Sequence, residues 1–145
     1  MSALRPLFLA LRAAIARFQL TVGLGFLSVV LGSLLAAKLL PWAQRVSSHR
    51  PMAEILLYGG LSRIWVWGVL PLLALAVARW IPVHPWMTAL GAALTGEAFL
   101  VALDFGISGL EPWAARPGFL VVRLLTLVIG IGITARGVAW RRRTA

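Results

Sequence analysis

Cysteine is absent from this chain of 145 residues, and acidic residues are nearly absent. Without thiols the chain can form no disulfide bond, hold no metal through thiolates and use no cysteine as a nucleophile. The 4 aspartates and glutamates stand against 14 lysines and arginines, of which Lys38 is the single lysine. The preference for arginine over lysine is typical of GC-rich bacterial coding and suggests a bacterial source.

Charge of either sign is also scarce. Charged residues make up 12% of the chain, about half of the roughly 25% that is usual in soluble domains. Hydrophobic residues make up 61%, and the mean hydropathy is +0.92. We therefore expect an integral membrane protein embedded in a lipid bilayer. The net charge of +10 does not indicate a nucleic-acid partner, because the basic residues cluster at the ends of apolar runs, where they meet anionic headgroups.

Four apolar runs predict an all-α, polytopic membrane fold. The expected transmembrane helices cover residues 20–40, 52–78, 87–110 and 119–138, each near the roughly 20 residues that cross a hydrocarbon core. We expect them to form one transmembrane bundle over residues 19–140. An amphipathic interfacial helix (residues 1–18) is expected before the bundle and a basic cytoplasmic tail (residues 141–145) after it. The short turn between the second and third spans predicts that these two are antiparallel neighbours.

The first 18 residues show the pattern of an amphipathic helix. Apolar residues recur there at three- and four-residue steps, namely Leu4, Leu7, Leu11, Ile15 and Phe18. Arg5, Arg12 and Arg17 lie between them and are expected to contact anionic lipids at the cytoplasmic face or a partner. A signal peptide is the alternative. Because no small-x-small cleavage site follows, we expect the segment to be retained.

The distribution of basic residues predicts the orientation. With the N-terminus inside, eight basic residues lie in the cytoplasm and four outside, which favours both termini inside. The inner set is Arg5, Arg12, Arg17, Arg79, Arg136, Arg141, Arg142 and Arg143, and the outer set is Lys38, Arg45, Arg50 and Arg116.

Small residues mark faces on which helices can approach closely. They recur at every fourth position in the first span, at Ser28, Gly32 and Ala36, and in the third, at Thr88, Ala92 and Gly96. We expect a bundle of this size to have too little interior for all such faces, so that some contact other proteins. The fourth span has one polar or small face that should point inward: Arg123, Thr126, Gly130, Thr134 and Gly137. In the second span, Pro71 cannot donate a backbone hydrogen bond and predicts a kink.

Four charged residues fall well inside the predicted spans, away from their ends, where each costs roughly 2.5–3.5 kcal/mol to insert. They are Arg63, Glu97, Asp104 and Arg123. At 1.5 Å per residue, Asp104 and Arg123 both lie roughly 8–9 Å below the outer end of their spans, Arg63 roughly 15 Å and Glu97 near 20 Å. We therefore predict two ion pairs, Asp104 with Arg123 and Arg63 with Glu97, with the third span between the second and the fourth.

These charges allow two interpretations. In the first, the arginine–carboxylate pairs neutralise one another and fix the packing of the helices. In the second, Glu97 or Asp104 carries protons or gates an ion, and Glu97 is the stronger candidate because it is deeper. Trp65 and Trp67 follow Arg63 in the second span and do not lie at the membrane interfaces, where the other tryptophans are predicted to lie. They are possible contacts for a lipid or a partner.

No other chemistry is indicated by the sequence. His49 and His84 are predicted on opposite sides of the membrane, so they cannot share a metal or haem, and no catalytic or nucleotide-binding motif occurs. We expect no enzyme activity and no cofactor. The favoured function is a small, non-catalytic integral subunit of a larger complex of membrane proteins, in a bacterial inner membrane. The alternative is a small homo-oligomeric channel or ion-coupled transporter that uses Glu97 and Asp104.

Overall fold

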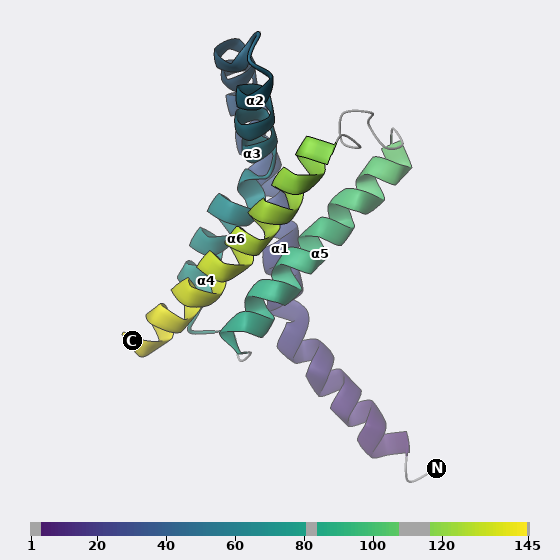
Figure 1. Ribbon diagram of the computed structural model, residues 1–145. Helices are drawn as coiled ribbons and strands as arrows, with labels where there is room; N and C mark the ends of the chain where they lie inside the picture. Colours follow the sequence, from purple (N-terminus) through teal and green to yellow (C-terminus); the bar gives the residue numbers. More distant parts are fainter. Residues whose placement is uncertain (1–3, 81–83, 108–116, 145) are drawn as a thin grey trace.

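The computed structural model describes residues 4–80, 84–107 and 117–144, and in these ranges it contains helices and turns but no strand (Figure 1). The all-helical class predicted from the sequence is confirmed. The elements in chain order are α1 (Leu4–Ser47), α2 (Pro51–Ala53), the π-helix η1 (Glu54–Tyr58), α3 (Gly59–Ser62), the π-helix η2 (Trp65–Val69), α4 (Leu70–Val77), α5 (Pro85–Ile107) and α6 (Pro117–Arg143).

Three of these helices, α1, α5 and α6, are long and apolar enough to cross a membrane. A fourth crossing results if the bent pair Pro51–Ser62 and Trp65–Val77 is counted as one span. The two halves of this pair meet at 52°. The chain therefore has the helices expected of an integral membrane protein, three or four in number according to whether the bent pair crosses as one span. We call residues 51–77 the broken span.

The first helix differs from the prediction, because residues 4–18 continue into the following turns and do not form a separate helix. α1 runs without interruption over 44 residues, from Leu4 to Ser47, and even contains Pro41. No proline or glycine pair lies between residues 18 and 20, so nothing in the backbone ends the helix where the hydropathy changes. At 1.5 Å per residue α1 is about 66 Å long, roughly twice the thickness of a hydrocarbon core.

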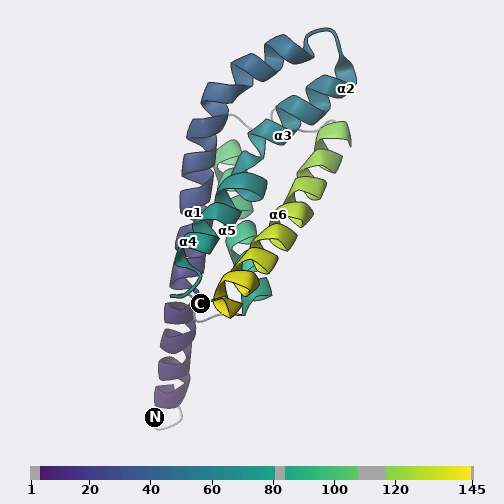
Figure 2. The same cartoon turned by 90° about the vertical axis from the view of Figure 1, so that its left-hand side faces the viewer.

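The helices alternate in direction, so that the ends of α1 and α6 that carry the two termini lie toward the same end of the molecule (Figure 1). α5 packs mainly against α1 and α6, and the broken span packs against the same two helices from the other side (Figure 2). α4 and α5 share little contact. The prediction that the third span lies between the second and the fourth is therefore wrong, because the broken span contacts α6 directly and meets α5 mainly through side chains. A short turn fixes the direction of the next helix but not the helix against which it packs.

The small-residue faces are used inside the bundle. Gly25 of α1 lies against the backbone of Ala92 in α5, and Gly32 lies against the backbone of Trp65 in η2. Gly130 of α6 lies against the carbonyl group of Val66. Contrary to the expectation from chain size, these faces need no second protein to cover them, because the bulky Trp65 and the backbones of neighbouring helices fill the notches that the glycines leave.

Candidate functional site

The bend between the two halves of the broken span is centred on Arg63. The Arg63 backbone leaves the helical region, with φ −103° and ψ 12°. Its N–H donates to the carbonyl of Gly60 and its carbonyl accepts from the N–H of Val66, each over 3.1 Å, so a tight turn replaces the α-helical pattern on both sides. The predicted kink at Pro71 is therefore misplaced. Pro71 lies inside the helical segment Trp65–Val77, two residues after the π-helix η2, and the helix continues through it.

Two side chains satisfy the carbonyl groups that the break exposes. The indole Nε1–H of Trp67 donates to the carbonyl of Gly60 over 2.7 Å, and the hydroxyl of Ser62 donates to the carbonyl of Gly59 over 2.8 Å. Free carbonyl groups in a hydrocarbon environment cost several kcal/mol each, by the usual magnitude for unsatisfied backbone groups. The residues around the break therefore supply the partners that water would supply in a soluble protein.

Arg63 and Arg123 converge on the carboxylate of Glu97. Nη2 of Arg63 donates to Oε2 of Glu97 over 2.5 Å, and Nε of Arg123 donates to Oε1. The side chains of Arg63, Glu97 and Arg123 are 9%, 17% and 25% exposed. Nε of Arg63 also lies 3.4 Å from the hydroxyl oxygen of Thr126, which accepts its hydrogen bond. One carboxylate thus joins the broken span, α5 and α6, and we call these three charged residues the Glu97 cluster.

The sequence anticipated only part of this cluster. The predicted ion pair between Arg63 and Glu97 is present. Arg123 was expected to pair with Asp104 and instead binds Glu97. Whether it also contacts Asp104 stays a prediction, because the Asp104 side chain lies outside the part of the chain that the structure describes. Residue counting missed the contact of Arg123 with Glu97 because it ignores helix tilt and the length of the arginine side chain.

The predicted inward face of the fourth span is confirmed. Thr134 is 1% exposed, Gly130 lies against Val66, and Gly137 lies against Leu75 of α4. Arg123 belongs to the Glu97 cluster and Thr126 contacts Arg63, so all five residues of the predicted face point into the bundle. Their three- and four-residue spacing was the signal that located them.

Trp65 lies at the centre of the bundle and not at a lipid or partner surface, which corrects the expectation from sequence. It is 1% exposed, its ring tip fills the notch at Gly96, and the guanidinium Cζ of Arg63 lies 5.2 Å from its ring centroid. That distance is within the range of a cation–π interaction. Trp67 is half-buried, so its predicted contact with a lipid or partner stays a prediction. The side chain of Arg17 lies outside the described residues.

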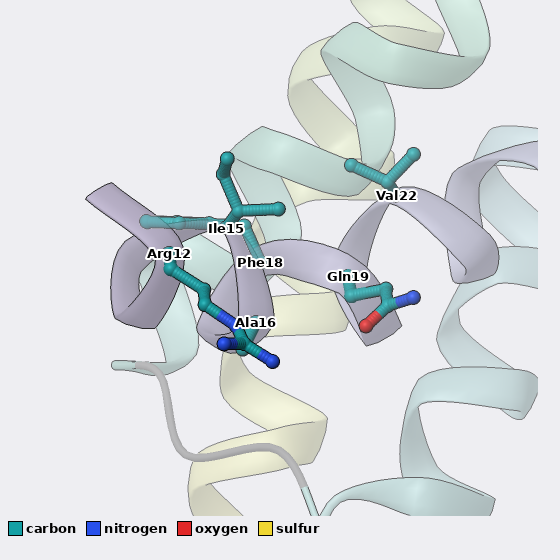
Figure 3. A pocket seen from close by; sticks show the side chains of 6 residues that line it. All are labelled: Arg12, Ile15, Ala16, Phe18, Gln19 and Val22. Carbon is teal, nitrogen blue, oxygen red and sulfur yellow. The ribbon is translucent and has the colours of Figure 1, made fainter. Parts of the chain in front are cut away.

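Away from the cluster, one surface hollow lies along α1 (Figure 3). Residues of this single helix line it: Arg12, Ile15, Ala16, Phe18, Gln19 and Val22. No group of three or more histidines and acidic residues that could hold a metal occurs in residues 4–80, 84–107 and 117–144. His49 follows α1 and His84 precedes α5, and these helix ends lie at opposite ends of the bundle (Figure 2).

No protein-family model, curated protein or solved structure matches this chain. Its function is therefore argued from the geometry of the Glu97 cluster, the broken span and the exposed surfaces.

Proposed function

We propose that this chain is a small, non-catalytic integral-membrane subunit of a larger membrane complex. The observation that carries the proposal is the state of Glu97, whose two carboxylate oxygens each accept a hydrogen bond from a different arginine. A carboxylate held in this way joins helices, whereas a proton carrier needs an oxygen that is free to bind and release a proton. The buried charges therefore support a structural role better than a transport role.

The proposed topology has four crossings, with both termini in the cytoplasm of a bacterial cell and the chain in its inner membrane. The excess of basic residues at the termini supports this orientation. It agrees with the position of the two terminal helix ends at the same end of the molecule (Figure 1). In this topology the first turns of α1 and the basic end of α6 are both on the cytoplasmic side.

A face of α6 is the best position for a neighbouring subunit. Val128 and Ile129 are 68% and 51% exposed, and a Cβ added to Gly132, one turn later, would have nothing within 4 Å. These residues share one face of the helix, since they are three and four positions apart. A partner helix could approach the backbone at Gly132 as helices do at other small residues in membranes.

Photo-crosslinking in the native membrane tests the subunit proposal. A benzophenone amino acid in place of Val128 should give a crosslink of one defined mass to a different polypeptide. The control is the same substitution at Leu72, a 69% exposed residue of α4. Crosslinks from Val128 only to a second copy of the chain, together with a pure homo-oligomer after mild solubilisation, would refute the proposal.

A homo-oligomeric channel or ion-coupled transporter is the second candidate, and the broken span favours it. Interrupted helices with π-helical segments are common at ion and substrate sites in membranes, and this break lies beside Glu97. Proton flux in proteoliposomes separates the two candidates. A flux that the wild-type chain supports and Glu97→Gln abolishes, in a variant that still inserts, would establish the transporter.

A further inference from the structure

The first turns of α1 project beyond the bundle. Every described side chain from residue 4 to residue 20 is exposed, and Thr21, at 1%, is the first buried residue. Figure 1 shows these turns, in purple, leaving the bundle obliquely. We call residues 4–20 the arm, which is about 25 Å long at 1.5 Å per residue. No other element of the described chain covers it.

The arm has one apolar stripe and one basic side. Leu9 and Leu20 lie on the opposite side of the arm, but at 100° per residue the other six of its eight large apolar residues fall within an arc of about 100°, the width of an amphipathic helix face. They are Leu4, Leu7, Phe8, Leu11, Ile15 and Phe18, all at least 36% exposed. Arg5 and Arg12 project from one edge of this stripe, and the first acidic residue of the chain, Glu54, comes long after the arm. The arm is therefore purely cationic as well as amphipathic.

The hollow on α1 lies where the arm joins the bundle. Like the arm, it has a polar side and an apolar side. Figure 3 shows the guanidinium group of Arg12 and the amide of Gln19 on one side, with Ile15 and Val22 on the other. A guanidinium and an amide can both donate hydrogen bonds to a phosphate group, and the apolar side chains suit a hydrocarbon chain. An acidic phospholipid contains both groups, a phosphate in its headgroup and hydrocarbon in its acyl chains.

We propose that the arm lies along the anionic lipid surface of the membrane, and that Arg12 and Gln19 bind the phosphate of an acidic phospholipid there. The apolar stripe enters the boundary of the acyl chains, and the arginines remain at the level of the headgroups. This position requires α1 to bend between the arm and the bundle, and Gly23, three residues after the arm, is the glycine at which it would bend. The inference rests on the proposed topology, which places the arm at the cytoplasmic leaflet.

Site-directed spin labelling of the full chain in vesicles tests this proposal. Since the chain has no cysteine, a single Leu11→Cys or Ala13→Cys carries the only label, on the apolar stripe or on the opposite face of the same helix. In vesicles of phosphatidylcholine with phosphatidylglycerol, the label at residue 11 should be accessible to oxygen and the label at residue 13 to a water-soluble nickel complex. Equal access of the nickel complex to both positions, or of oxygen to both, would overturn the proposal.

The charge requirement is tested with Arg12→Gln and the matched control Arg143→Gln, which removes the same charge from the exposed basic end of α6. Loss of one arginine contact should raise the fraction of chains whose arm is detached from the vesicle surface. We expect an increase of about fivefold, from the usual contribution of one basic residue near an anionic surface. The increase should occur only with phosphatidylglycerol present. No effect of Arg12→Gln, or an equal effect of the control, would overturn the binding of acidic lipid.

Failure of this proposal is distinguishable from failure of the proposed function. A label at Val128→Cys on α6 reports insertion of the bundle in the same vesicles, independently of the arm. Shielding of residue 11 from both reagents in native membranes, but not in vesicles, would assign the stripe to a protein partner and overturn the lipid assignment while supporting the subunit proposal.

Discussion

The backbone of Trp65 in η2 occupies the space where a side chain on Gly32 of α1 would have to be. A Cβ at Gly32 would lie 2.5 Å from the Cα of Trp65 and 2.9 Å from its amide nitrogen. Real Cβ atoms essentially never come this close to backbone atoms. The two helices therefore meet backbone to backbone, and this contact holds the second half of the broken span against α1.

Substitution of Gly32 by alanine should destabilise the bundle, because backbone atoms and not a flexible side chain must move. We expect a loss of about 1–3 kcal/mol in the free energy of unfolding, the usual cost of overpacking a filled interior. The measurement is reversible unfolding in mixed micelles or bicelles.

The matched control is Gly23→Ala on the same helix. A Cβ there would have nothing within 4 Å, so we expect no loss and a gain of up to about 1 kcal/mol from the higher helix propensity of alanine. An equal effect of the two substitutions would contradict the close contact between Gly32 and Trp65.

The tryptophan that caps the break offers a second prediction. Trp67→Phe keeps an aromatic ring but removes the N–H that donates to the carbonyl of Gly60. We expect a loss of about 0.5–1.5 kcal/mol in the free energy of unfolding, the usual net contribution of one hydrogen bond, because the carbonyl of Gly60 still accepts from the N–H of Arg63. Amide hydrogen exchange at residues 63–66 should become faster, because the turn loses one of its fixed partners. Trp140→Phe, at an exposed position near the end of α6, should leave this exchange unchanged, and equal protection in both variants would argue against the cap.

The presence of several apolar helices long enough to cross a membrane could be predicted from the sequence, because hydropathy over twenty residues depends on little else. The break at Arg63 could not. Pro71 is the stronger helix breaker by residue type, yet the helical segment Trp65–Val77 continues through it and the bend lies at Arg63. The turn at Arg63 exists because tertiary contacts hold it, namely the ion pair with Glu97 and the hydrogen bond from Trp67 to Gly60.

The cluster was predictable as a set of charges but not as a set of contacts. An isolated carboxylate in lipid requires a partner, so the pairing of Glu97 with an arginine follows from composition alone. The choice of Arg123 as its second partner depends on the tilt between α5 and α6, which the sequence does not encode locally. For the same reason the sequence did not reveal that Trp65 lies in the centre of the bundle.

The proposed topology predicts the accessibility of two single cysteines. In intact cells, a membrane-impermeant maleimide should label Ser48→Cys, in the turn after α1, and should not label Thr144→Cys, after α6. Permeabilised cells should show labelling at both positions. Labelling of Thr144→Cys alone in intact cells would invert the orientation, and labelling of both would contradict an even number of crossings.

The Glu97 cluster gives the most demanding prediction, because its three charges should be interdependent. Glu97→Gln leaves two arginines in the bundle without their carboxylate, and we expect a loss of about 3–5 kcal/mol in the free energy of unfolding. Replacing both arginines by methionine in the same chain should recover much of this loss, because no buried charge is then left unpaired. Glu54→Gln, at an exposed position, should have little effect. If the triple variant is as unstable as Glu97→Gln, the damage comes from lost packing and not from stranded charge, and the structural role proposed for the cluster is wrong.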